Sequence, residues 1–120
     1  YITYSQGEKQ KVKIARALMA NPKILILDEP AVGLDLAARE DLLDLMGTIT
    51  KSGATLLYVT HHIEEITESI THVLLLKDGH VVAQGPKQDV LTNETLSKTY
   101  GVPIRVRWDA ERPWISVLKK

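Results

Sequence analysis

A short apolar run that ends in two carboxylates constrains the fold of this chain more than any other feature. Residues 24–27 are all aliphatic, and Asp28 and Glu29 follow them directly. A continuous run of this length is typical of a strand buried on both faces, as in a parallel sheet covered by helices. We therefore expect an α/β fold with both acids at the carboxyl end of a buried strand.

The segments around this run alternate between helical and strand patterns. Residues 8–20 and 35–51 carry apolar side chains at helical spacing, and Asp35 can cap the second helix. Residues 54–60 form a second apolar run, and residues 62–70 fit a short helix. Helices that lie between apolar strands predict a parallel α/β layer.

The rest of the chain is expected to form a smaller antiparallel tail. Asp78-Gly79 lies between two apolar segments, which is a strong hairpin signal. The expected elements are strands over 73–76 and 81–83, two short helical pieces over 86–100, and strands over 102–108 and 114–117.

Composition excludes several classes of function. The chain has 15 basic and 15 acidic side chains, a balance that argues against a general nucleic-acid binder. It has no cysteine, which excludes a disulfide framework, a thiolate metal site and a cysteine nucleophile. Its apolar runs are far shorter than the roughly 20 residues of a membrane span, so we expect a soluble chain. It begins at Tyr1 and not at methionine, which favours a piece of something longer.

The start of the first helix is a candidate phosphate site. A helix N-terminus presents unpaired N–H groups and the positive end of the helix dipole. Gly7 would let the backbone approach a ligand closely, and the Ser5 hydroxyl could donate to it. Taken alone, the motif fits another explanation better, because Ser5 and Glu8 are spaced as a capping box that needs no ligand.

The strand ends supply further candidates. One carboxylate of Asp28 and Glu29 could hold hydrated Mg²⁺ while the other orients or deprotonates a water, but both could also be ordinary loop acids. His61 follows the second strand and could donate to a phosphoryl group, although a lone histidine is more often structural. His62 leaves open which histidine faces a site. Asp35 taken alone is a helix cap.

Together and in this order, these residues resemble the ATP-binding-cassette (ABC) ATPase family. Residues 4–10 are similar to the family signature, usually Leu-Ser-Gly-Gly-Gln, and VKIARAL at 12–18 continues it. Residues 24–29 look like the Walker B strand with the catalytic glutamate. Residues 33–35 look like the D-loop, and His61 looks like the switch histidine.

The resemblance predicts a domain organisation. It covers essentially residues 4–85, and the tail is loosely similar to cassettes of metal-chelate importers. We expect the C-terminal part of an ABC ATPase domain over residues 1–85 and a helical and strand tail over 86–120.

The sequence also departs from the family pattern. Gln6 stands at the usual first glycine, Glu8 at the usual glutamine, and His62 where an aspartate is frequent. No Gly-x-x-x-x-Gly-Lys-Ser/Thr occurs in the sequence, and the family places this P-loop before the signature. The resemblance therefore implies a P-loop NTPase-like ABC ATPase fold that is incomplete, from the signature onward.

The resemblance also implies roles for the site residues, with ATP and Mg²⁺ as cofactors. Two cassettes would sandwich two ATP molecules head to tail. The residues at the partner's nucleotide would be Ser5, Gln6, Gly7 and Glu8, with Asp35 coupling the two sites. Asp28 would hold Mg²⁺ through water, Glu29 would polarise the attacking water, and His61 would contact the γ-phosphate.

Three functional hypotheses follow. The first is an ATP-hydrolysing subunit that powers an ABC transporter, inactive without its Walker A half. Its partners would be a second ABC ATPase subunit and a membrane-spanning subunit, with no nucleic acid, at the cytoplasmic side of a membrane. The alternative is a truncated, non-catalytic cassette that regulates or dimerises. The third is an unrelated phosphate-binding domain that uses the Ser5 helix end. The residues that precede Tyr1 would separate the first two.

Strands without the P-loop strand beside them should leave apolar faces uncovered and favour self-association.

Overall fold

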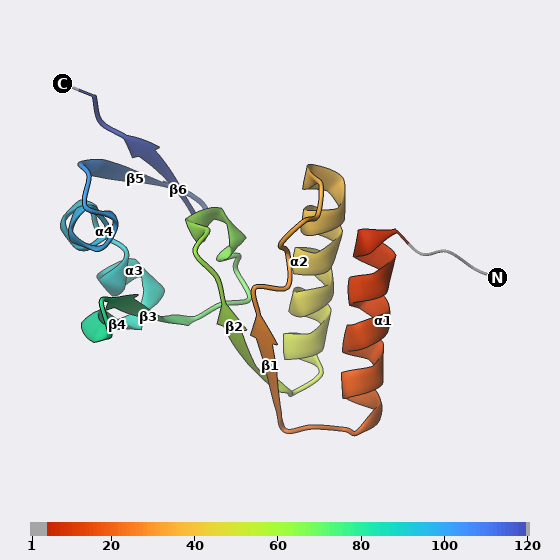
Figure 1. Ribbon diagram of the computed structural model, residues 1–120. Helices are drawn as coiled ribbons and strands as arrows, with labels where there is room; N and C mark the ends of the chain where they lie inside the picture. The colour runs from red at the N-terminus through yellow and green to blue at the C-terminus, as the bar shows by residue number, and fades with distance from the viewer. Residues whose placement is uncertain (1–4, 120) are drawn as a thin grey trace. The chain divides into compact units, whose positions relative to one another are not determined.

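A computed structural model describes residues 5–119, which form a series of helices and two-stranded sheets (Figure 1). Tyr4, the first residue of the predicted signature motif, lies outside the described residues. The chain divides into two compact units, Tyr1–His61 and His62–Lys120. This division reflects which residues pack together. The boundary expected at residue 85 rests instead on where the family motifs end, and it stays a prediction.

The first unit is a parallel strand pair with two helices. Its elements are α1 (Gln6–Met19), β1 (Ile24–Asp28), α2 (Leu36–Lys51) and β2 (Thr55–Val59). β1 pairs with β2 in parallel, from Ile24 opposite Thr55 to Asp28 opposite Val59, and α2 connects the two strands (Figure 1). The predicted parallel α/β layer is therefore confirmed.

The core of the first unit lies on only one face of this sheet. Leu25 is 4% exposed and packs in a cluster with Ile14 of α1 and Met46 of α2. Ile24 and Ile26, on the other face, are 59% and 63% exposed. The expectation of a strand buried on both faces is wrong for the described residues, because both helices of this unit pack on the Leu25 side.

The uncovered sheet face is apolar across both strands. We call it the outer face, and it consists of Ile24, Ile26, Leu57 and Val59, each classed among the exposed large hydrophobic side chains. Ile26 lies directly opposite Leu57 in the strand register. Such a face was expected, because the P-loop strand that the family resemblance places beside these apolar strands does not occur in the sequence.

The second unit is built from two hairpins and short helices. Its elements are η1 (Ile63–Glu65), β3 (His72–Lys77), β4 (His80–Pro86), α3 (Lys87–Val90), α4 (Asn93–Tyr100), β5 (Ile104–Asp109) and β6 (Arg112–Val117). β3 pairs with β4, and β5 pairs with β6, both antiparallel, as predicted. Leu96, Leu91 and Val90 are at most 2% exposed and form the centre of its core.

The predicted turn of the first hairpin is confirmed in its backbone. Asp78 and Gly79 have φ values of 50° and 77°, so both lie in the left-handed region. A two-residue hairpin turn of this kind needs positive φ at both positions, which an aspartate followed by glycine tolerates well.

The helix expected over residues 62–70 is wrong. The segment forms only the 3₁₀ turn η1, because Ile66 adopts an extended backbone with ψ 94°. The next residue, Thr67, has its carbonyl bound by the Lys87 ammonium at 3.0 Å. Ile63 and Ile66 are buried all the same, so the apolar spacing that suggested a helix is satisfied by one turn and the bend after it.

No helix within residues 5–119 has both the length and the apolar character needed to cross a membrane.

Candidate functional site

The parallel pairing brings two predicted site residues together at the carboxyl ends of β1 and β2. Glu29 directly follows β1, and its backbone N–H donates to the Val59 carbonyl at 2.8 Å. His61 follows β2, and its Nε2 lies against the Glu29 carboxylate oxygen Oε1. The side chain of Glu29 is 31% exposed and that of His61 is 75% exposed, although the Glu29 Oε1 atom at the contact is itself buried.

Glu29 sits in a backbone conformation that is uncommon for a residue with a side chain. Its φ is 47°, in the left-handed region that favours glycine. Such conformations cost on the order of 1–3 kcal/mol and persist where the surroundings hold them. This conformation redirects the chain after β1. The side chain of Glu29 therefore does not continue the alternation of side chains along the strand. The sequence carries no signal for this conformation.

Asp28 has a different environment from its neighbour, as expected for adjacent residues at a strand end. It is exposed and shares a sheet face with Ile24 and Ile26. Within the described part of the chain, no hydrogen bond or ion pair engages its carboxylate. Mg²⁺ commonly takes one or two carboxylates and keeps several waters, so one free carboxylate fits such an ion. Residues 5–119 contain no cluster of three or more His, Asp or Glu side chains that could enclose a metal.

The predicted capping box at the start of α1 is present. The Glu8 backbone N–H donates to Ser5 Oγ at 3.2 Å, and the Ser5 N–H donates to Glu8 Oε1 at 3.3 Å. The carboxylate of Glu8 is therefore bound to the first turn of its own helix. A serine hydroxyl that accepts a bond can still donate its proton, so Ser5 remains able to bind an anion. The ligand roles of Ser5, Gln6 and Glu8 stay predictions.

Gly7 has a packing role that the sequence did not indicate. A Cβ placed on Gly7 would lie 3.0 Å from the Cβ of Ala38, a contact tighter than most Cβ atoms make, so Ala38 would have to shift by a few tenths of an ångström. The glycine thus lets the first turn of α1 rest directly on the first turn of α2. This role is compatible with backbone approach to a ligand but does not require one.

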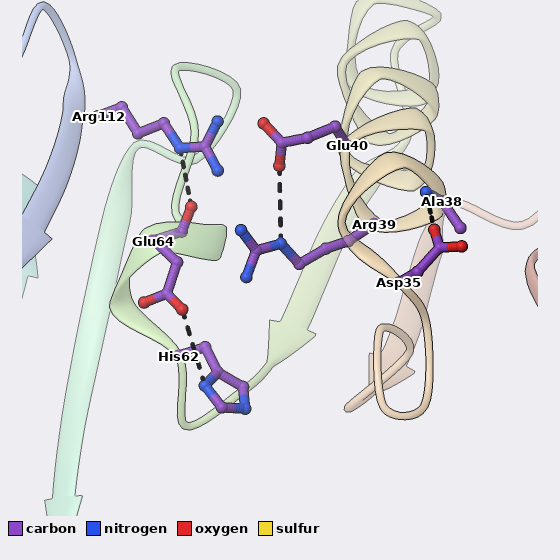
Figure 2. A network of polar contacts seen from close by, with 7 residues as sticks. All are labelled: Asp35, Ala38, Arg39, Glu40, His62, Glu64 and Arg112. Carbon is purple, nitrogen blue, oxygen red and sulfur yellow. Dashed lines mark hydrogen bonds and ion pairs between the residues drawn. The ribbon is translucent and has the colours of Figure 1, made fainter.

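Asp35 caps α2, as predicted. Its carboxylate Oδ1 accepts from the Ala38 backbone N–H at 2.8 Å (Figure 2). The coupling role implied by the family resemblance stays a prediction.

The structure separates the two adjacent histidines. His61 contacts Glu29 in the first unit, whereas His62 Nδ1 lies 3.9 Å from Glu64 Oε1 in the second (Figure 2). The Glu64 carbonyl accepts from Arg112 Nε at 2.8 Å, and the Arg112 guanidinium lies 4.7 Å from the centre of the Trp114 ring. His61 is therefore the histidine at the candidate site.

Gln10 is a neighbour of the site that sequence reasoning missed. Its side-chain amide donates to the carbonyl of Pro30, the residue after Glu29. Its place three residues after Gly7, on the same side of α1, is the signal that could have drawn attention to it.

Comparisons with known proteins place this geometry in context. A family model described as "ABC transporter" matches residues 1–32. An uncharacterized ABC transporter ATP-binding protein of Bacillus subtilis (strain 168) is 49% identical over 118 residues, which is 97% of this chain and 45% of that protein. The chain thus spans less than half of this relative's length.

Two solved structures are similar as well. An ABC transporter in an inward-facing conformation, described as of metal-chelate type, matches with a TM-score of 0.86 and 26% identity, over 97% of this chain and 48% of that one. The ADP conformation of an ATP-binding cassette matches with a TM-score of 0.72 and 28% identity, over 81% of this chain and 40% of that one. The expected ABC ATPase fold, incomplete relative to a full cassette, is confirmed.

Proposed function

Because the chain belongs to the family of ABC transporter ATP-binding proteins, we propose that it is part of an ATP-hydrolysing subunit that powers a transporter. The observation that carries this proposal is the contact of Glu29 with His61 at neighbouring strand ends. Two side chains of these types, at the open edge of a parallel sheet, are suited to activating a water and donating to an anion.

The proposed chemistry assigns separate work to the two side chains. The Glu29 carboxylate orients the attacking water and takes its proton, since a carboxylate is an acceptor when ionised. The imidazole of His61 donates toward the phosphoryl oxygens. Phosphoryl transfer depends mainly on such positioning and on charge compensation, so the left-handed backbone that aims Glu29 is part of the proposed mechanism.

The cofactors of this proposal are ATP and Mg²⁺. Asp28 would hold the hydrated ion through water, and the N-terminus of α1, with Ser5 and Gly7, would contact the phosphates of a nucleotide on a second cassette. Bound Mg²⁺ neutralises charge on the phosphoryl oxygens. The phosphate cradle and its lysine would come from outside this sequence. A second ATPase subunit and a membrane-spanning subunit, at the cytoplasmic side of the membrane, complete the proposed assembly.

ATP hydrolysis tests the role of Glu29. In the polypeptide that carries these residues, assembled with its partners, Glu29→Gln should lower kcat by about a hundredfold or more while ATP binding is retained. The exposed Asp44→Asn variant on α2 removes the same charge and should hydrolyse ATP at the wild-type rate. Wild-type turnover by Glu29→Gln would overturn the assignment, and no hydrolysis by the wild-type assembly would overturn the proposed function.

Nucleotide binding by the chain alone is a second test. Since the proposal draws the phosphate cradle from elsewhere, the chain by itself should bind MgATP only weakly in calorimetry. Tight, stoichiometric binding by the isolated chain would contradict this division of the site.

A further inference from the structure

We propose that Gln10 is a positioning residue for Glu29, which acts through the turn that follows β1. The Gln10 amide donates to the Pro30 carbonyl and so ties α1 to the residue next to Glu29. The effect on catalysis rests on the proposed function above, whereas the effect on the turn does not.

The turn needs support from outside itself. Glu29 adopts its left-handed φ of 47°, and the first local bond after it, from the Val32 N–H to the Glu29 carbonyl, is long at 3.3 Å, whereas that from the Leu34 N–H to the Ala31 carbonyl has an ordinary length of 3.1 Å. Pro30 has no N–H to contribute. Its carbonyl is therefore the group of this residue that an external donor can hold, and the Gln10 amide is placed there.

α1 presents this donor from a fixed position. Gly7, one turn before Gln10, lets α1 rest on Ala38 of α2, and Ile14, one turn after it, is 2% exposed in the core of the unit. Residues three and four apart share one side of a helix. Gln10 is thus flanked by two anchored positions, and its amide is pre-organised toward the turn.

Hydrogen exchange tests the contact directly. Gln10→Glu keeps the length of the side chain, but an ionised carboxylate cannot donate to a carbonyl. The amides of Val32 and Leu34 should then exchange about fivefold faster, since one hydrogen bond of ordinary strength is lost. Amides within β2 should keep their rates. Lys13→Gln, on an exposed position of the same helix with the same change of charge, should leave all of these rates unchanged.

Steady-state kinetics test the positioning role. In the assembled ATPase, Gln10→Glu should lower kcat about tenfold while KM stays within about twofold, because only the aim of Glu29 is disturbed. Gln10→Lys restores a donor and should recover both the exchange rates and kcat. If Gln10 had a purely structural role, its substitution would lower thermal stability without lowering kcat selectively at a nearly constant KM.

The outcomes separate the two proposals. Unchanged exchange at Val32 and Leu34 in Gln10→Glu would overturn the inference. If that variant does not fold, wild-type exchange in Gln10→Lys supports the inference and raised exchange overturns it. Faster exchange in Gln10→Glu, with no ATPase activity in the wild-type assembly, would support the contact while removing the proposed function.

Discussion

Two single residues in the second unit, the buried Lys87 and the 38% exposed Tyr100, have shifted pKa values. Lys87 is 2% exposed, and desolvation lowers its pKa from 10.5, although the charges of Glu111 and Glu68 act in the opposite direction. Desolvation raises the pKa of Tyr100 from 10.0, and the charge of Glu64 raises it further. Lys87 therefore loses its proton at a lower pH than an ordinary lysine, and Tyr100 keeps its proton to a higher pH than an ordinary tyrosine.

These opposite shifts predict a stability profile with two limbs. Above the lowered pKa of Lys87 the unfolded chain binds the additional proton, so the free energy of unfolding should rise with pH up to about 10.5. Tyr100 contributes stability that is present below about pH 10 and is lost as the pH rises through its raised pKa. Urea unfolding across this pH range should show that the rise in the free energy of unfolding disappears in Lys87→Met. The loss of stability at higher pH should disappear in Tyr100→Phe. Profiles identical to the wild type would contradict both assignments.

At the scale of elements, the start of α2 depends on one cap. Asp35→Ala removes the acceptor of the Ala38 N–H and should lower the free energy of unfolding by about 1 kcal/mol, while Asp35→Ser should retain most of it. Asp44→Ala, in the exposed middle of the same helix, serves as the control in urea unfolding. Equal stability of Asp35→Ala and the control would show that the cap contributes nothing.

The elements that depend on neighbours in sequence were predictable. The capping box of Ser5 and Glu8, the Asp35 cap and the Asp78-Gly79 turn each need only a few consecutive residues, and each is present. The helix expected over 62–70 failed because Ile66 leaves helical geometry where tertiary packing, and not spacing, determines the backbone.

The candidate site was predictable in its members but not in its geometry. That Glu29 and His61 follow paired strands could be read from the two apolar runs. The left-handed φ of Glu29 could not be predicted, and neither could the hydrogen bond from the Gln10 amide to the Pro30 carbonyl. Both arise where segments distant in sequence meet. Which sheet face is covered is likewise a property of helix placement, which local sequence does not encode.

At the scale of the whole chain, the outer face of β1 and β2 should govern association. Ile26→Lys with Leu57→Glu places opposite charges at directly opposed positions of this face, so the core is untouched and the pair is favourable. In sedimentation velocity the isolated wild-type chain should self-associate with rising concentration, and this double variant should shift toward monomer.

A second exposed apolar pair supplies the control. Leu76 and Val81 lie opposite each other in the β3–β4 hairpin, and both are more than half exposed. Leu76→Lys with Val81→Glu should associate like the wild type. A monomeric wild type, or an equal effect of both double variants, would contradict the role given to the outer face.

The connection of β1 to β2 also sets an order of events during synthesis. The β3–β4 and β5–β6 hairpins are each closed by two residues, and hairpins of this kind form in about 1–10 μs. β1 must instead wait until all of α2 and then β2 have left the ribosome, since parallel pairing requires closure of that long loop. Throughout this interval the aliphatic strand that precedes Asp28 and Glu29 lacks its partner strand β2, so its apolar side chains stay exposed to aggregation in the nascent chain.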